Sequence, residues 1–268
     1  MLSNYHTHTT FCDGQNSAEE VVLSAIDKGF SSIGFSGHGT TPFDLSYCMT
    51  DMEGYIKEIS RLKEKYMEQI EVYCGVEEDA LSYVKRSDFD YLIGSCHYLC
   101  VKDKYYSIDS SRDHQSKCLE TFDNDVLKMS EMYYSTFVNY IKERKPDIAG
   151  HFDLITKFDE IGEQRYLNNE KYFEIAEKYL KIAAEEDVIF EVNTGAMIRG
   201  IRTSPYPCER LLHILKNKES KIILSSDSHS ADTLNAYFDD MLYMLRNVGF
   251  EYVYEFSKGE FKKKSILG

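Results

Sequence analysis

Histidines and acidic residues recur in this sequence at one kind of position, at the ends of short apolar stretches that are typical of β-strands. Six of the eight histidines lie there. Each of these polar residues ends or directly follows a predicted strand, whose range is given in parentheses. They are His6 and His8 (2–6), His38 (32–36), Glu77 (71–76), His97 (91–95), His151 (148–151), Glu191 (188–192), and Asp227 and His229 (221–225). This repetition constrains the fold more than any other feature, because few folds bring the ends of successive strands to one place.

Longer segments with the apolar spacing of helices separate these strands. Two predicted helices start at the capping boxes in 17–20 and 50–53. The others are predicted over 119–142, 170–186, 209–217 and about 231–247. Segment 107–115 is predicted to be a loop, 251–256 an eighth strand, and 258–264 a solvated tail. Strands that alternate with helices indicate βα units around a parallel sheet. We therefore expect an α/β protein with a single domain over residues 1–268.

The composition is that of an ordinary globular protein. Of the 268 residues, 43% are hydrophobic and 28% are charged, which excludes a fibrous or wholly disordered chain. No apolar run approaches the roughly 20 residues that a membrane-spanning helix needs, so we expect no membrane partner. The first residues have neither the basic start nor the apolar stretch of a secretory signal. The seven cysteines are odd in number and scattered, which favours reduced thiols and a cytoplasmic location.

The net charge limits the partners. The 31 Lys and Arg residues are outnumbered by 45 Asp and Glu residues, which gives a net charge of −14. A negative field disfavours nucleic-acid backbones and anionic membranes. It does not exclude a small phosphorylated substrate, because bound metal ions reverse the sign of the charge locally.

The placement of the polar residues predicts a metal site. In a βα barrel the carboxyl ends of the strands converge on one mouth, where active sites are built. Imidazoles and carboxylates gathered there favour cations such as Zn, Fe or Mn. His6 and His8 point to the same face of a strand, so both can bind one ion. Asp227 and His229 repeat that spacing.

The chain contains, in this order, the motifs HTH with a following Asp, SGH, GVE, GSCH, GHFD, FEVNTG and SDSH. Together they resemble the PHP (polymerase and histidinol phosphatase) superfamily of metal-dependent phosphoesterases. The resemblance covers nearly the whole chain. It implies a distorted, TIM-like (β/α)7 barrel that holds three divalent metal ions.

The resemblance also implies a ligand for each metal ion. The first ion is expected at His6, His8, Glu77 and Asp227, the second at Glu77, His97 and His151, and the third at Asp13, His38 and His229. The chain resembles the histidinol-phosphate phosphatase branch of this superfamily in four features: Asp13, its length, the GHFDL stretch and the NTG…YP region. We therefore expect hydrolysis of L-histidinol phosphate to L-histidinol and phosphate, a reaction of histidine biosynthesis.

The expected chemistry assigns further roles. A hydroxide that bridges two metal ions is the expected nucleophile at phosphorus. Asp227 or His229 is the candidate for moving a proton toward the leaving oxygen. Arg165 and Arg199 are predicted to bind the phosphate, because a guanidinium group matches its oxygens.

Other parts of the substrate and other functions stay open at this point. Candidates for binding the substrate amine are Glu78, Asp79 and Asp153, and candidates for flanking its imidazole are Phe43, Tyr98 and Tyr206. The alternative substrates are nucleotides, oligonucleotide ends and phosphotyrosine. An amidohydrolase is disfavoured because Glu77, and not a lysine, stands at the bridging position. A catalytically silent partner-binding module is disfavoured because all nine expected ligands are present.

Overall fold

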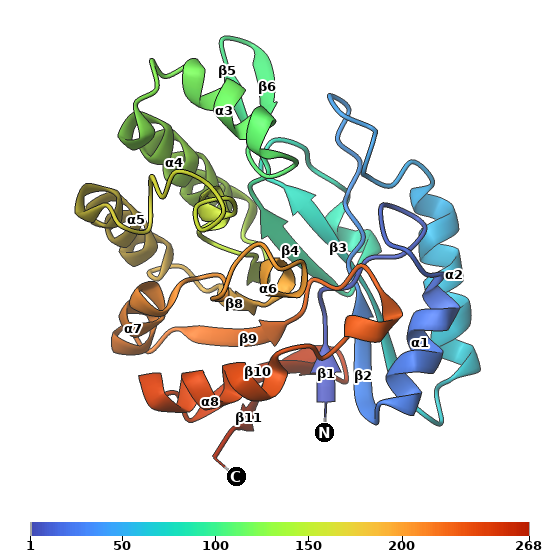
Figure 1. Cartoon of the computed structure of the whole chain (residues 1–268). Helices are drawn as coiled ribbons and strands as arrows, with labels where there is room; N and C mark the ends of the chain where they lie inside the picture. The colour runs from blue at the N-terminus through green and yellow to red at the C-terminus, as the bar shows by residue number, and fades with distance from the viewer. Residues whose placement is uncertain (1, 268) are drawn as a thin grey trace.

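The computed structural model describes residues 2–267, and most of its strands lie parallel in one curled sheet (Figure 1). Within these residues the sheet has nine strands in the order β1-β2-β3-β4-β7-β8-β9-β10-β11. The strands are β1 (Leu2–Asn4), β2 (Phe30–Phe35), β3 (Glu71–Asp79), β4 (Tyr91–Ser95), β7 (Ile148–Ala149), β8 (Ile189–Asn193), β9 (Lys221–Ser225), β10 (Tyr252–Ser257) and β11 (Glu260–Ser265). All neighbours pair in parallel except β10 and β11.

The sheet closes on itself just beyond β1 and β9. Thr7 and Ser228 form an isolated parallel bridge, and the amide of His8 donates to the carbonyl of Ser228 over 2.8 Å. The Asn4 side chain donates to Ser226 Oγ over 2.6 Å. This narrow seam joins the end of the first strand to the end of β9, the seventh strand in the sheet order. The expectation of a distorted (β/α)7 barrel is therefore confirmed.

The helices lie on the outside of the sheet, except α6 (Gly195–Ile198), which lies at the upper end of the barrel (Figure 1). They are α1 (Ala18–Asp27), α2 (Met52–Lys65), α3 (Arg112–Glu120), α4 (Val126–Arg144), α5 (Glu170–Ala183), α6 (Gly195–Ile198), α7 (Glu209–Asn217) and α8 (Phe238–Val248). One apolar core lies under α1 and α2, and a larger one lies under α4, α5, α7 and α8. Among the described residues, no helix is both long enough and apolar enough to cross a membrane.

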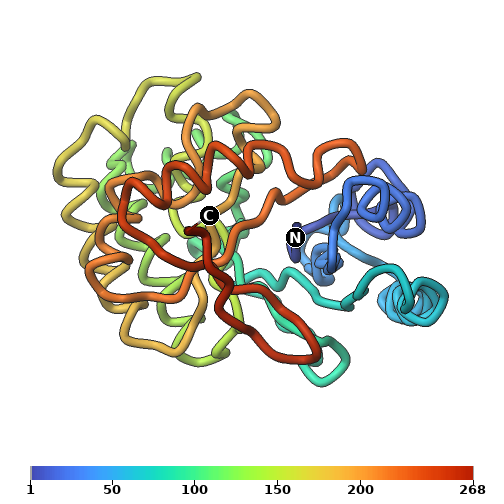
Figure 2. The backbone as a smooth tube through the Cα atoms, turned by 90° about the horizontal axis from the view of Figure 1, so that it is seen from below, coloured from blue at the N-terminus to red at the C-terminus, as the bar shows by residue number. Residues whose placement is uncertain are grey.

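Aromatic side chains fill the lower end of the barrel. Tyr5, Tyr73, Tyr91 and Phe256 pack together there with isoleucines from the strands. The β10–β11 hairpin lies beneath them (Figure 2). Gly75 has to lack a side chain, because a Cβ atom there would overlap the ring of Tyr91. The barrel is thus closed below, and its upper end is left for a site.

Two predictions for the middle of the chain were wrong. Segment 119–142 is not one helix, because a turn separates α3 from α4. Asp123 and Asn124 adopt positive φ angles of 57° and 60° in that turn, and the Asp125 side chain caps α4. Part of the predicted loop 107–115 is helical, since Ser111 caps α3. The hairpin of β5 (Tyr98–Val101) and β6 (Lys104–Ser107) was not predicted.

The ends of three other elements also needed correction. The α2 helix begins after Asp51, whose side chain accepts from the amide of Gly54, and not at a capping box on Thr50. The α8 helix begins at Phe238, after Tyr237 with a φ of 64°. The predicted tail forms β11, because Phe261 packs against Phe256 of the barrel floor.

Candidate metal centre

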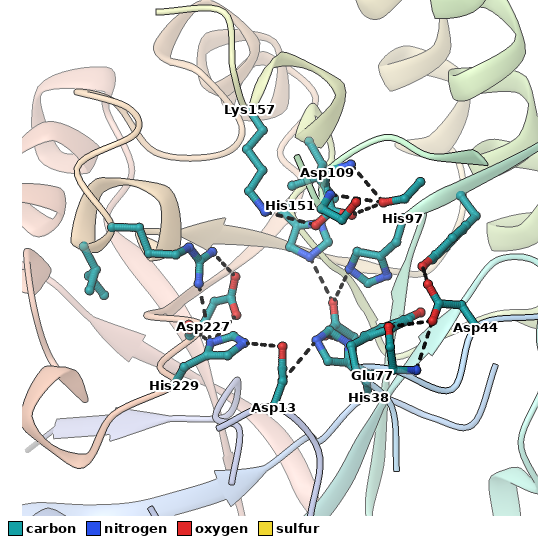
Figure 3. Close-up of a pocket in the computed structure, with 18 of the residues that line it drawn as sticks. Asp13, His38, Asp44, Glu77, His97, Asp109, His151, Lys157, Asp227 and His229 are labelled. Atoms are coloured by element: carbon teal, nitrogen blue, oxygen red, sulfur yellow. Dashed lines mark hydrogen bonds and ion pairs between the residues drawn. The ribbon is translucent and has the colours of Figure 1, made fainter. Parts of the chain in front are cut away.

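The upper end of the barrel gathers all nine predicted metal ligands. Figure 3 shows those that line the cavity there. Each comes from the carboxyl end of a strand or from the loop that follows it. Four groups have ligand atoms within 4.8 Å of one another: His8, Asp13, His38 and His229; His6, Glu77 and His151; His6, His8 and Asp227; and His38, Glu77 and His97. The structure therefore brings together residues that lie as far apart in the sequence as His6 and His229.

Glu77 is the centre of this arrangement. Its carboxylate is buried, and five imidazole rings surround it. The nitrogen–oxygen distances to Glu77 are 2.9 Å for His38, 2.9 Å for His151, 3.1 Å for His6, 3.2 Å for His97 and 3.6 Å for His8. Its Oε1 also accepts from Ser95 Oγ over 2.6 Å. A carboxylate whose two oxygens face different histidines has the position that a bridging ligand requires.

A second group lies closer to solvent, around Asp13. His229 Nε2 is 3.3 Å from one oxygen of Asp13, and His38 Nε2 is 3.7 Å from the other. The rings of His8 and His229 stack with their centroids 4.1 Å apart. Asp13 lies in the loop before α1, where the amide of Gly14 donates to the carbonyl of Thr9. This short turn folds the loop back over the barrel mouth.

The pKa values of the cluster follow from burial and mutual charge. Burial acts to raise the pKa of Glu77, but His6 and His38 hold it well below its ordinary value. Burial and the neighbouring His229 lower the pKa of His8 to about 3. Glu77 is therefore ionised and His8 neutral at pH 7, which are the protonation states that metal coordination requires.

Several polar atoms of the cluster have no hydrogen-bond partner among residues 2–267. These buried atoms are His6 Nε2, His8 Nε2, His97 Nδ1, His151 Nδ1 and Glu77 Oε2. Unpartnered buried polar atoms are rare in folded proteins and indicate an ion or another missing partner. His6 Nε2, His8 Nε2 and Glu77 Oε2 also face one another. The donor set fits divalent metal ions that take nitrogen and carboxylate ligands.

A cavity of about 620 Å³ opens beside the cluster (Figure 3). Two cations line it. Arg199 donates to Asp227 Oδ2 over 3.1 Å, and Lys157 Nζ lies 3.1 Å from Asp109 Oδ2. Arg199 was predicted from the sequence, whereas Lys157 was missed. Its position in the loop after β7, at the same end of the barrel, was the signal for it.

The predicted phosphate ligand Arg165 lies elsewhere. Its guanidinium pairs with Glu163 over 2.7 Å and lines a separate pocket of only about 40 Å³. The loop after β7 is long, and its later residues pack against α3 instead of turning toward the barrel mouth. We therefore correct the prediction for Arg165.

The three candidates for the substrate amine do not line the cavity. Glu78 is buried and accepts from Arg144 over 2.7 and 2.9 Å. Asp79 accepts from the amide of His97, and Asp153 accepts from the amide of Cys208. The carboxylates that line the cavity beyond the predicted ligands are Asp44 and Asp109.

Of the three aromatic candidates, one lines the cavity. Tyr98 does so, next to Tyr47. Phe43 packs behind it between Tyr98 and Tyr105. Tyr206 is 1% exposed and lies beneath the site, against Arg202.

The sequence is similar to those of known proteins over most of its length. The chain is 29% identical over 252 residues to a probable histidinol-phosphatase of Schizosaccharomyces pombe, covering 85% of this chain and 81% of that one. It is 26% identical over 262 residues to the histidinol-phosphatase of Bacillus subtilis, covering 88% and 97% of the two chains.

The fold is shared with a solved structure from Lactococcus lactis, a histidinol phosphate phosphatase complexed with zinc, L-histidinol and phosphate. The TM-score is 0.74 at 20% identity, and the match covers 97% of this chain and 98% of that one. A putative histidinol phosphatase from Listeria monocytogenes has a TM-score of 0.70 at 20% identity, over 89% and 99% of the chains. The family model of the PHP domain matches residues 4–195. This chain belongs to the PHP domain family.

Proposed function

We propose that this protein is a metal-dependent phosphomonoesterase that hydrolyses L-histidinol phosphate to L-histidinol and phosphate. One observation carries the proposal: a buried carboxylate among five imidazoles shares a cavity with two cationic side chains, Arg199 and Lys157. Metal ligands beside groups that bind anions suit a phosphate ester. The names of the relatives, and the histidinol and phosphate in the Lactococcus lactis complex, support this particular substrate.

The proposed cofactors are three divalent ions, of zinc, iron or manganese. Four overlapping ligand groups, two around Glu77 and one each around Asp227 and Asp13, support more than one metal position, and we propose three. Bound ions of this kind neutralise phosphoryl oxygens and lower the pKa of water, so that a nucleophile forms near pH 7.

The chain's own side chains are proposed to bind and orient the ester. Arg199 and Lys157 lie on the cavity wall and are the proposed contacts of the phosphate oxygens. Each is already paired with a carboxylate, Asp227 or Asp109, which holds it in place. Asp227 and His229 lie beside Arg199, so either is positioned to move a proton to the leaving oxygen.

Asp44 is the proposed contact for the substrate amine. Burial acts to raise its pKa, but hydrogen bonds from Ser46 and Tyr98 hold the pKa below its ordinary value, so Asp44 is ionised at pH 7. Within residues 2–267 no lysine or arginine is ion-paired with Asp44, whereas Asp109 is neutralised by Lys157. Tyr47 and Tyr98 are the proposed neighbours of the imidazole ring.

Two further parts of the proposal concern the whole protein. We propose that the chain is a single domain and that it acts in the cytoplasm on a small molecule and not on nucleic acid. All seven cysteines are free, which supports a reducing environment. The net charge of −14 supports the exclusion of nucleic acid.

Phosphate release by the metal-loaded protein tests the proposal. The substrates are L-histidinol phosphate, an aryl phosphate, phosphotyrosine, a mononucleotide and an oligonucleotide with a terminal phosphate. We expect kcat/KM for L-histidinol phosphate to exceed the others by about 10³ or more, which corresponds to about 4 kcal/mol of transition-state discrimination. Equal and weak activity on all substrates would contradict the proposed substrate, and preference for another ester would replace it.

A further inference from the structure

One buried carboxylate at the barrel mouth does not belong to the predicted ligand set. Glu191 lies in β8, in the FEVNTG motif, and its side chain is fully buried. It is close to the metal cluster but behind it, between the ends of β1 and β7. A buried carboxylate needs hydrogen-bond donors for both oxygens.

Glu191 makes three hydrogen bonds that satisfy both oxygens. Its Oε1 accepts from His6 Nδ1 over 2.6 Å. Its Oε2 accepts from the backbone amide of His151 and from Asn193 Nδ2, both over 2.9 Å. One carboxylate therefore holds two predicted metal ligands that come from different strands.

The bond to His6 determines which ring nitrogen is free. Because the carboxylate of Glu191 only accepts, His6 must carry its proton on Nδ1. In the neutral ring the lone pair is then on Nε2, which has no hydrogen-bond partner among residues 2–267 and lies 3.1 Å from Glu77 Oε2 and 3.7 Å from Asp227 Oδ1. Nε2 is thus the atom that faces the cluster.

The surroundings of Glu191 leave it little freedom. The β8 strand pairs with β7 on one side and with β9 on the other, where Glu191 is opposite Ile223. Asn193 is held as well, because its Oδ1 accepts from the amide of Gly195 over 2.8 Å. The carboxylate is therefore fixed before any ligand binds.

We propose that Glu191 is a positioning residue that sets the tautomer of His6 and ties it to the backbone of His151, so that the ligands of two metal positions keep one geometry. The proposal rests on the metal centre proposed above. Partners of this kind behind the ligands typically change metal affinity or activity by about 10- to 100-fold when they are substituted.

The variant Glu191→Gln has nearly the same shape but the wrong hydrogen-bonding groups. If the amide oxygen faces His151 and Asn193, the amide NH₂ faces His6 Nδ1. His6 must then accept at Nδ1 and carry its proton on Nε2, which blocks coordination. In the opposite orientation, the NH₂ group faces two other donors. Either orientation opposes metal binding.

Zinc affinity, measured by competition with a chromophoric chelator, tests the proposal without substrate. We expect Glu191→Gln to bind zinc about 10- to 100-fold more weakly at the affected positions. The matched control is Asp159→Asn, because Asp159 is also buried and accepts from two amides, those of Tyr166 and Leu167, away from the cluster. The control should bind zinc as the wild type does. Wild-type zinc affinity in folded Glu191→Gln would overturn the proposal.

A second measurement does not depend on the variant's folding. Long-range ¹H–¹⁵N correlation spectra of the zinc-loaded wild type report the tautomer of each histidine. We expect the proton of His6 on Nδ1, and a proton on Nε2 would overturn the proposal. Failure of the substrate assignment is distinguishable, because the wild type would then bind zinc with His6 in this tautomer but would not hydrolyse L-histidinol phosphate.

Discussion

Arg199 and Arg165 both lie in loops that follow strands of the barrel, but only Arg199 lines the cavity. We expect Arg199→Met to lower kcat/KM for L-histidinol phosphate by about 10- to 100-fold, because a hydrogen bond to a charged group contributes about 1.5–3 kcal/mol. Arg165→Met is the matched control and should change kcat/KM by less than about two-fold. Steady-state kinetics at equal zinc content check this, and equal losses in the two variants would contradict it.

Asp44 allows a test of specificity at one residue. Asp44→Asn keeps the shape of the side chain but removes the charge that faces the proposed amine. We expect kcat/KM for L-histidinol phosphate to fall by about ten-fold or more, since a charge-assisted hydrogen bond is lost. The rate with an aryl phosphate, which has no amine, should stay unchanged. Equal losses with both substrates would show that Asp44 supports the site without reading the amine.

Residue positions were predictable from the sequence where a strand fixes the direction of the side chain. Glu77 and the histidines at strand ends are of this kind. The two-residue period of β3 also explains why Glu78 turns away to Arg144 while Glu77 faces the cluster, so the error on Glu78 was avoidable. Lys157 and Arg165 lie in an irregular loop, where no period indicates direction.

At the scale of elements, the β5–β6 hairpin forms one wall of the cavity together with the loop before α2. Tyr105 of the hairpin stacks on Phe43 with centroids 4.0 Å apart, and the Tyr98 hydroxyl donates to Asp44 over 2.6 Å. The wall was not predicted, because the hairpin turns at Lys102 and Asp103 with positive φ and without a glycine. The turn at 121–125 between α3 and α4 was not predicted either, because Asp123 and Asn124 also have positive φ angles and are not glycines.

This wall leads to a prediction about Tyr105. We expect Tyr105→Ala to raise KM for L-histidinol phosphate several-fold, because the loop that carries Asp44 loses a stacking contact worth about 1 kcal/mol. Zinc content should stay unchanged, since no predicted ligand lies on the hairpin. Tyr243→Ala is the control, because Tyr243 is an exposed tyrosine on α8. An unchanged KM in Tyr105→Ala would show that the wall does not need this contact.

For the whole molecule, the predicted metal ligands span the seam between the ends of β1 and β9, so we expect metal binding and folding to be coupled. Ligands from the segment after β1, from β3 and from the loop after β9 share the site. If the chain is one domain, as proposed, residues 2–267 should unfold in a single transition. Removal of the metal ions should lower the melting temperature of the entire protein, because ions that bind only the folded state stabilise it.

The sign of the pH dependence follows from the histidines of the metal-free protein. Burial acts to lower the pKa values of His6, His97 and His229, but nearby carboxylates raise all three above their ordinary value. Their contribution to stability is complete below the unfolded pKa of about 6.5 and is lost as pH rises through the folded pKa values. His8, with a pKa of about 3, stays neutral in the folded protein. It therefore lowers the stability only below about pH 6.5, where the imidazole of the unfolded chain takes up a proton.

The metal-free and zinc-loaded proteins should therefore diverge between pH 6.5 and 8. The metal-free protein loses stability over this range, whereas zinc binding strengthens because its histidine ligands must be neutral. For a chain of this size each kcal/mol corresponds to about 2–4 °C, so the gap in melting temperature should widen by several degrees. Thermal unfolding in matched buffers, with chelator or with excess zinc, measures it. Parallel curves over this range would contradict the coupling, because they would mean that these histidines do not exchange protons for metal ions.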